Sequence, residues 1–141
     1  MAVSGTVPAR RTPRFQPHRI ALRVRRLTAV LGLTAALWFA LRYGARLVPA
    51  DMDTVPSIPP GSFCLVDRWA SGLRVGSDVF VATPVGELLS RVRALDGELV
   101  HLEHPNPRTA WSDSSKFGPV PKSQVLGLVL VVFEAGAARG R

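Results

Sequence analysis

An uncharged apolar segment near the N-terminus constrains this chain more than any other feature. Residues 27–41 read LTAVLGLTAALWFAL. As a helix rising about 1.5 Å per residue, this segment would measure about 22 Å, which is shorter than a hydrocarbon core of about 30 Å. Extending the helix to residue 48 gives 22 residues, enough to span a bilayer if the side chains of Arg42 and Arg46 reach outward to its surface. Pro49 then ends the helix. We therefore expect a transmembrane anchor over residues 27–48.

Positive charge is concentrated before this segment. Seven of the 18 Lys and Arg residues lie within residues 1–26, and the first 50 residues contain no Asp or Glu. Beyond residue 26 the chain carries 11 basic and 10 acidic residues, so the net charge of +8 belongs to the tail. A nucleic-acid-binding domain would carry a basic stripe on its folded part, which argues against a nucleic-acid partner. Basic residues are retained on the inner side of membranes, so we predict a disordered cytoplasmic tail over residues 1–26.

Two other interpretations of the apolar segment stay open. Val48-Pro49-Ala50 has the small-residue pattern of a signal-peptide cleavage site, although it lies nine residues beyond the apolar core. An Arg-rich, acid-free N-terminus is also typical of an organelle transit peptide, which would place the chain in the mitochondrial inner membrane. We favour a retained single-pass anchor in the cell membrane, with the N-terminus cytoplasmic and the rest of the chain on the outer face.

The residues after Pro49 follow a β pattern. Short runs rich in Val, Leu and Phe alternate with turn signals that contain Gly and Pro, and Asp96-Gly97 between two such runs is typical of a β-hairpin. No segment here has a convincing helical period, and residues 134–141 are a loose tail rich in Ala, Gly and Arg. The sequence therefore predicts a mostly β fold, a small antiparallel domain over residues 50–133 preceded by one N-terminal transmembrane helix. The predicted strands are residues 63–67, 78–83, 88–95, 99–103 and 125–133.

Side chains that bind metals or form covalent cross-links are scarce. The single cysteine, Cys64, lies in an apolar run, which is typical of a small buried side chain and excludes an intramolecular disulfide. His101 and His104 lie three residues apart and are interpreted as surface residues. The sequence contains no CxxC pair and no cluster of Cys and His, so we expect neither a metal site nor a cofactor.

Four short motifs follow one another between residues 52 and 133. They are residues 56–66, PSIPPGSFCLV, residues 76–84, GSDVFVATP, residues 89–97, LSRVRALDG, and residues 113–121, DSSKFGPVP, with Val125-Leu126-Gly127 after the last. In this order, and after an N-terminal anchor, the motifs resemble the type I signal peptidase family, which includes the mitochondrial inner-membrane peptidases. The resemblance implies an antiparallel β domain that acts on exported preproteins.

The resemblance also implies a serine nucleophile and a lysine general base, and this sequence has replaced both. Alignment of the first motif without gaps places the nucleophile position at Asp53, and the lysine position, just before Arg91, is Ser90. A carboxylate is a poor nucleophile towards an amide, and serine has no basic atom with a pKa near 7. The family's aspartate is kept as Asp113, whereas Ser115 stands where the family has arginine. We therefore predict a degenerate member without catalytic activity.

Two interpretations in which activity survives stay open. Conjugative-transfer peptidases of the same superfamily carry the pattern S-x-P-x-G-x-Y around the nucleophile, and residues 57–63 match it with Phe in place of Tyr. On that alignment Ser57 is the candidate nucleophile, but the base position still lacks a lysine. Alternatively, Asp53 and Asp113 form a carboxylate pair that shares a proton, as in aspartic peptidases. The structural alternative is that Ser57 only belongs to the turn before Pro59-Pro60-Gly61.

Three functions are compatible with these residues. The favoured one is a membrane-anchored, catalytically inactive signal-peptidase homologue that binds exported proteins or an active signal peptidase. The second is an active serine endopeptidase that removes signal or maturation peptides from exported proteins. The third is an anchored β domain with an unrelated role, since a fold by itself does not establish a function. The expected partners are the membrane, an exported preprotein or signal peptide, and an active signal peptidase.

Overall fold

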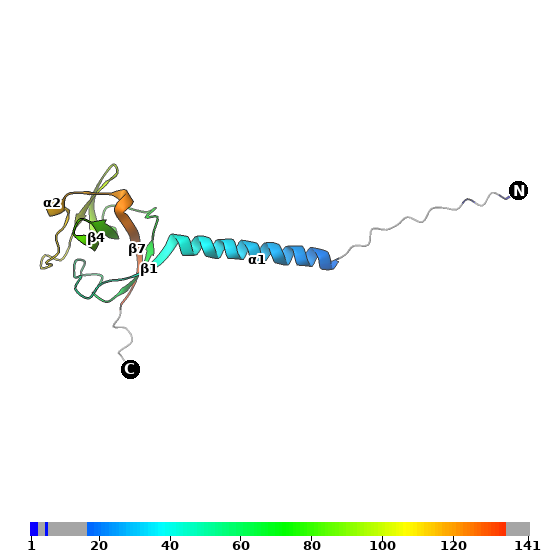
Figure 1. The fold of residues 1–141 in the computed structure, drawn as a ribbon, viewed down its shortest axis with the longest axis horizontal. Coiled ribbons are helices and arrows are strands. Elements are labelled where there is room, and N and C mark those ends of the chain that lie inside the picture. Colours follow the sequence, from blue (N-terminus) through cyan, green and yellow to red (C-terminus); the bar gives the residue numbers. More distant parts are fainter. Residues whose placement is uncertain (3–4, 6–16, 135–141) are drawn as a thin grey trace, which may run out of the picture. The chain divides into compact units, whose positions relative to one another are not determined.

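The computed structural model describes residues 1–2, 5 and 17–134, and the chain divides into two compact units (Figure 1). The first unit is Met1–Ala36 and the second is Leu37–Arg141. The second unit holds the last residues of the N-terminal helix together with all the described strands. The predictions made for residues 3–4, 6–16 and 135–141 fall outside the described residues.

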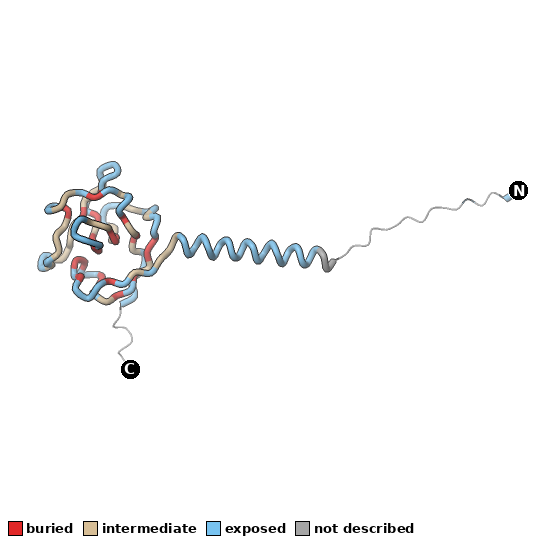
Figure 2. The backbone as a smooth tube through the Cα atoms, in the orientation of Figure 1, coloured by how far each residue is buried: buried red, intermediate tan, exposed pale blue. Residues whose placement is uncertain are grey.

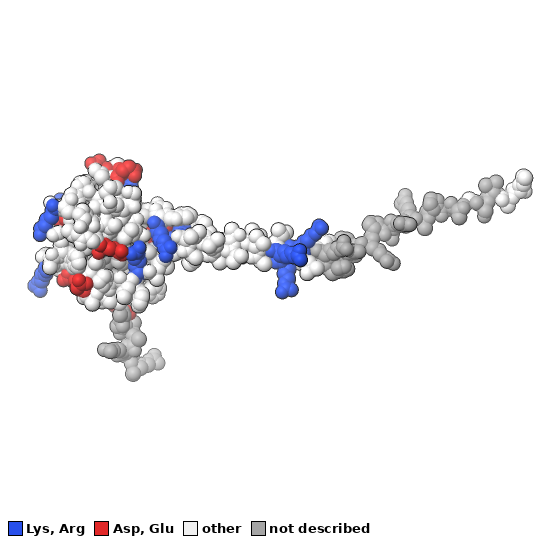
Figure 3. Space-filling model, viewed as in Figure 1, with Lys and Arg blue, Asp and Glu red and all other residues white. Residues whose placement is uncertain are grey.

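A single long helix, α1, extends over Pro17–Arg42. Its residues Ile20–Arg42, 23 in all, contain an 18-residue window with a mean hydropathy of 1.4, and the segment is long and apolar enough to cross a membrane. Figure 2 shows this helix exposed over residues 20–41, and Figure 3 shows an uncharged stretch in it, which corresponds to the sequence between Arg26 and Arg42. The hydroxyls of Thr28 and Thr34 donate to carbonyls four residues earlier, so both are satisfied within the helix, as an apolar environment requires.

The ends of α1 differ from the sequence expectation. The helix begins at Pro17, so residues 17–26 are helical rather than disordered, because proline suits the first helical turn and Arg, Leu and Ala favour helix. The helix ends at Arg42 rather than at residue 48, and Tyr43–Leu47 form strand β1. Gly44 disfavours helix, and β1 pairs along its whole length with strand β2, Phe63–Asp67.

The seven described strands form one antiparallel sheet in the order β1-β2-β7-β3-β4-β5-β6. The predicted fold class is confirmed, and the structure contains all five predicted strands. Branched and aromatic side chains favour these strands because they pack well on a pleated surface. The remaining strands are β3 Asp78–Thr83, β4 Gly86–Asp96, β5 Leu99–Glu103, β6 Val120–Pro121 and β7 Val125–Phe133.

Two hairpins place β4 in the middle of the region that carries the site. Strands β3 and β4 join through a tight turn in which Thr83 pairs with Gly86. Strands β4 and β5 join at Asp96-Gly97, which confirms the predicted hairpin. Gly97 has a φ of +57°, a left-handed conformation that glycine adopts without steric cost.

The core lies on both sides of the central strands. Val79, Phe80 and Val81 of β3 are buried in succession, as are Leu88, Leu89 and Ser90 of β4, and Figure 2 shows where the buried residues lie along the chain. Cys64 is fully buried on β2, as expected, and burial together with the nearby charge of Asp78 raises the pKa of its thiol. One of two adjoining clusters packs the segment after β1 against β2 and β4, and consists of Val48, Met52, Val55, Ile58, Cys64, Val66, Phe80, Leu88 and Leu89. The first residues after β1 are therefore part of the folded domain.

Two short helical turns connect β5 with β7. Helix α2 is Ser114–Phe117, and the 3-10 helix η1 is Lys122–Gln124. The sequence pattern did not indicate them, because four residues are too few to establish a helical period. Helix α2 contacts β5, so the loop at residues 104–113 begins and ends next to that strand.

Candidate functional site

The residues that the family resemblance singles out come from three segments of the β domain. The first is the loop at residues 51–58, the second is the middle of β4, and the third is the loop at residues 104–113. Met52, Val55 and Ile58 are buried and fix the first loop on the core. The exposed Asp53 and Ser57 alternate with these buried residues, so their side chains are presented outward.

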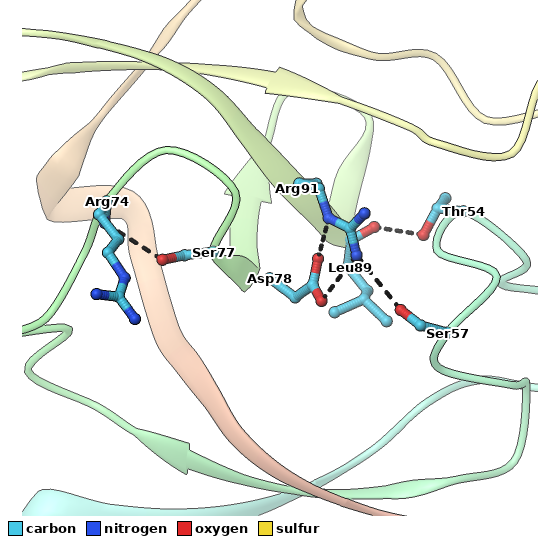
Figure 4. Close-up of polar contacts among 7 residues, drawn as sticks. All are labelled: Thr54, Ser57, Arg74, Ser77, Asp78, Leu89 and Arg91. Atoms are coloured by element: carbon cyan, nitrogen blue, oxygen red, sulfur yellow. Dashed lines mark hydrogen bonds and ion pairs between the residues drawn. The ribbon is translucent and has the colours of Figure 1, made fainter.

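The first loop and β4 contact each other where the two catalytic positions were expected. The Thr54 hydroxyl donates a hydrogen bond to the Leu89 carbonyl, as Figure 4 shows. The Leu89 amide lies 3.1 Å from the Met52 sulfur. Each contact joins a neighbour of Asp53 to a neighbour of Ser90. The fold therefore brings together the segments that carry the nucleophile and base positions.

Ser90 lies on β4 and is fully buried. Its Oγ lies 2.8 Å from Nε2 of His104. The other ring nitrogen of His104, Nδ1, lies 3.1 Å from the carbonyl oxygen of Trp111. A carbonyl only accepts hydrogen bonds, so Nδ1 carries a proton, and in the neutral ring Nε2 accepts the bond from the Ser90 hydroxyl.

This pair has the hydrogen-bond pattern of a serine and its histidine base. Its burial argues against catalysis, because a substrate carbonyl must reach the serine oxygen and Ser90 has no exposed surface. The pair instead ties β4 to the loop at residues 104–113. The residue at the position that the resemblance assigns to lysine is thus a hydroxyl with its hydrogen bond made, and not a base.

The sequence interpretation of His104 as a surface residue was incomplete, since the side chain is only partly exposed and has two hydrogen-bond partners. The register of the β4–β5 hairpin is the one sequence signal that could have indicated the contact between His104 and Ser90. Arg91 pairs with Glu103, and one further step along this register brings Ser90 opposite His104. A bulge between Val92 and Ala94 makes that register hard to count from the turn alone.

Asp53 is bound to the third segment. Its carboxylate accepts hydrogen bonds from the Thr109 hydroxyl at 2.6 Å and from the Asn106 side-chain amide at 3.3 Å. The same amide donates to the Asp53 carbonyl at 2.7 Å. Asp113 bonds to Ser115 instead. The hydrogen bonds of Asp53 therefore do not connect it with Asp113 as the carboxylate pair considered above. Asp53 here orders a loop.

Ser57 contacts an ion pair rather than a base. Arg91 on β4 binds Asp78 on β3 through two bonds of 2.8 and 3.2 Å, and its Nη2 donates to Ser57 Oγ at 3.3 Å (Figure 4). Hydrogen bonding to Asp78 raises the pKa of Arg91, so the guanidinium keeps its proton. A permanent cation donates to a serine oxygen but cannot remove the serine proton. Ser57 is exposed, and its role as a nucleophile stays a prediction.

Asp113 and its neighbours have a structural role in the loop. Asp113 is the N-cap of α2 and accepts bonds from the amide of Ser115, at 2.9 Å, and from its hydroxyl. The bond from the Ser115 hydroxyl is the largest influence that lowers the pKa of Asp113. The buried hydroxyl of Ser114 bonds to both the amide and the carbonyl of Leu102, at 2.8 Å each, and fastens α2 to β5.

Three surface pockets border this region. A polar pocket of about 200 Å³ lies beside His104 and is lined by Asn106, Thr109 and Lys116 among others. A second pocket, of about 340 Å³, adjoins His101 and α2, and a third, of about 430 Å³, adjoins the loop before β3. None of these three pockets is lined by Asp53, Ser57 or Ser90. Within the described part of the chain, no three His, Cys, Asp or Glu side chains are grouped as metal ligands.

Comparison with known proteins adds no relative, because no protein-family model matches the chain and no curated protein matches it. The resemblance to type I signal peptidases therefore rests on the four sequence motifs and their order. In the structure, the segments that hold Asp53 and Ser90 contact each other, and the side chains of these two residues form hydrogen bonds with other groups.

Proposed function

We propose that this chain is a membrane-anchored, non-catalytic homologue of type I signal peptidases, which binds exported preproteins or an active signal peptidase. One observation carries the proposal. The segments that would hold the nucleophile and the base contact each other through Thr54 and Leu89, yet the hydroxyl in the base position, Ser90, is fully buried on His104. A peptidase site needs an accessible nucleophile and a neutral base within hydrogen-bond reach.

The retained anchor is supported by the fold around residue 50. Cleavage after Ala50 would remove strand β1 and also Val48, which is fully buried in the core. Strand β1 is the sheet neighbour of β2, so its loss would expose the edge of β2. This supports a chain that keeps α1. The proposed place of the β domain, on the outer face of the cell membrane, rests instead on the basic residues before the span.

Photo-cross-linking tests the binding role. Vesicles that contain the full chain are mixed with a preprotein whose signal peptide carries a photoreactive residue. We expect a cross-link that an excess of unlabelled signal peptide suppresses. Ser57→Trp should reduce the cross-link, because Ser57 is exposed on the loop at residues 51–58 and contacts Arg91 of β4. The matched control is Ser123→Trp on η1, also an exposed serine.

The result distinguishes the two modes of action. A wild-type chain that gives no cross-link to the preprotein, but co-purifies with an active signal peptidase, would favour the peptidase partner. Equal cross-linking by wild type and both tryptophan variants would contradict a binding surface at Ser57. The second candidate function, an active serine endopeptidase, rests on the exposure of the Ser57 hydroxyl and requires a base that its contacts do not supply.

A further inference from the structure

A bulge in strand β4 brings an arginine next to a histidine of strand β5. Val92 pairs with Leu102 and Ala94 pairs with His101, so the register passes over Arg93. In such a bulge, two residues of one strand oppose a single residue of the other, and here Arg93 and Ala94 oppose His101. Bulges are common next to functional sites, where they redirect a side chain. Arg93 and His101 line the same pocket, which agrees with this placement.

The walls of this pocket come from three elements, β4, β5 and α2. Its lining residues are Arg93, Ala94, His101, Ser114 and Ser115. The bonds from the buried Ser114 hydroxyl to Leu102 hold α2 beside β5, so the third wall is fixed to the second. The volume is about 340 Å³, which falls within the roughly 300–1,000 Å³ of pockets that bind small molecules. The pocket therefore has room for a small ligand.

Two side chains at the pocket have hydrogen-bond donors that the described part of the chain does not use. The arginine side chains that bond to other described residues are Arg42, Arg46 and Arg91. Every bond of a histidine ring among those residues belongs to His104. A guanidinium has five N–H donors and stays charged, and an imidazole has at least one donor. The donors of Arg93 and His101 are thus available to a ligand.

The charge at the pocket favours an anion. Its five lining residues include no Asp or Glu. Glu103, two residues beyond His101 on β5, lies opposite Arg91 in the hairpin register. The carboxylate of Asp113 accepts bonds from the amide and the hydroxyl of Ser115. A concave site with a permanent cation and no carboxylate in its walls attracts negatively charged ligands.

We propose that this pocket binds the phosphate group of a small water-soluble molecule. The guanidinium of Arg93 donates paired bonds to two phosphate oxygens, and the imidazole of His101 donates to a third. A carboxylate has only two oxygens, which the guanidinium alone would engage, so the second donor favours phosphate. Ala94 is the one apolar residue of the five that line the pocket, so the walls offer little surface to the acyl chain of a lipid. The proposal depends neither on the resemblance to signal peptidases nor on the anchor.

Calorimetric titration of the full chain with glycerol 3-phosphate, in micelles of an uncharged detergent, tests the site. Glutamate at equal ionic strength is the carboxylate control, and phosphatidic acid added to the micelles presents the same phosphate on a lipid. The variants are Arg93→Gln and Arg93→Lys. The matched control is Arg74→Gln, which also removes an exposed arginine but at a different pocket. The chain has three histidines, so nuclear magnetic resonance can follow the ring signals of His101 and His104 separately.

We expect wild type and Arg74→Gln to bind glycerol 3-phosphate equally, and Arg93→Gln to bind it about tenfold more weakly, because it loses bonds to a charged group. Arg93→Lys should recover only part of the affinity, since an ammonium lacks the planar fork. The ring signals of His101 should shift on titration of wild type, and those of His104, which lines another pocket, should shift less.

Three results would overturn the proposal. The first is that wild type does not bind glycerol 3-phosphate, or binds it no better than Arg93→Gln does. The second is that glutamate binds as tightly as glycerol 3-phosphate, which would indicate a site for any anion. The third is binding of phosphatidic acid without binding of glycerol 3-phosphate, which would make a lipid the source of the phosphate. The near-ultraviolet signal of each variant verifies that the β domain is folded.

Discussion

Replacing Gly127 with alanine is expected to lower the free energy of unfolding of the β domain by about 2 kcal/mol, within the range found for overpacked cores. Gly127 is buried on β7. A Cβ at this position would lie 2.8 Å from both Cβ and Cγ2 of Val66, which is itself fully buried. Strands β2 and β7 cannot move apart without losing their hydrogen bonds, so the clash can be relieved only at a cost in free energy.

Urea unfolding of the full chain in detergent micelles, followed by the near-ultraviolet signal of the β domain, measures this effect. Gly72→Ala is the matched control, because its added Cβ would meet only the Leu128 Cδ2 at 3.6 Å, an ordinary contact, and we expect a change below about 0.5 kcal/mol. Val66→Gly removes the Val66 atoms that the added Cβ would meet, so its cost and that of Gly127→Ala should not be additive. Equal destabilisation by Gly127→Ala and Gly72→Ala would contradict this packing.

Replacing Asp67 with asparagine is expected to destabilise the chain by about 2 kcal/mol at neutral pH, because it removes a buried carboxylate that accepts three hydrogen bonds. These come from Arg42 Nη2 at 3.2 Å, the Ser71 hydroxyl at 2.9 Å and the Trp69 amide at 3.0 Å. The same bonds connect the end of α1 with the loop after β2. The guanidinium of Arg42 also lies 5.3 Å from the centroids of the Trp38 and Trp69 rings, and Asp67→Asn should weaken these contacts as well.

The effect of Asp67→Asn should depend on pH. Burial by itself would raise the pKa of Asp67, but the hydrogen bonds from Ser71, Trp69 and Arg42 outweigh it and hold the pKa below its ordinary value of 3.8. Because the pKa of Asp67 is lower in the folded state than in the unfolded state, the charged carboxylate stabilises the fold fully at pH values above the unfolded pKa. The contribution is lost as the pH falls through the lower folded pKa.

Unfolding free energies of wild type and Asp67→Asn should thus converge as the pH falls below about 4. The control is Asp51→Asn, an exposed carboxylate for which we expect little difference at any pH. A constant gap between wild type and Asp67→Asn from pH 7 to pH 3 would show that the carboxylate charge is not what stabilises this junction.

Much of the fold follows from local sequence, and the exceptions have physical causes. Runs of Val, Leu and Phe predicted five strands, and Asp96-Gly97 predicted a hairpin, because these preferences act over a few residues. From the sequence, the residues of β1 were assigned to the transmembrane anchor, because they directly follow an apolar helix. Their strand conformation depends on pairing with β2, which lies twenty residues later in the chain. The short helix α2 depends on its cap, Asp113, and on the bond from Ser114 to β5.

The candidate site was only partly predictable. The motif order identified Asp53 and Ser90, and the structure places their neighbours Thr54 and Leu89 in contact. The partner of Ser90, His104, was missed because it lies across a bulged hairpin and its second bond goes to a backbone carbonyl. Hydrogen-bond partners of this kind depend on tertiary packing, which a residue pattern does not encode locally.

Peptide-bond cleavage tests the central claim most directly. The full wild-type chain is reconstituted in vesicles with a preprotein, alongside Ser57→Ala, Ser90→Ala and an active signal peptidase as a positive control. Because Ser90 is buried and Ser57 contacts a permanent cation, we expect wild type to release no more mature protein than either alanine variant, while the active enzyme processes the same preprotein. Cleavage by wild type that is lost in Ser57→Ala would contradict a non-catalytic chain and establish the alternative function.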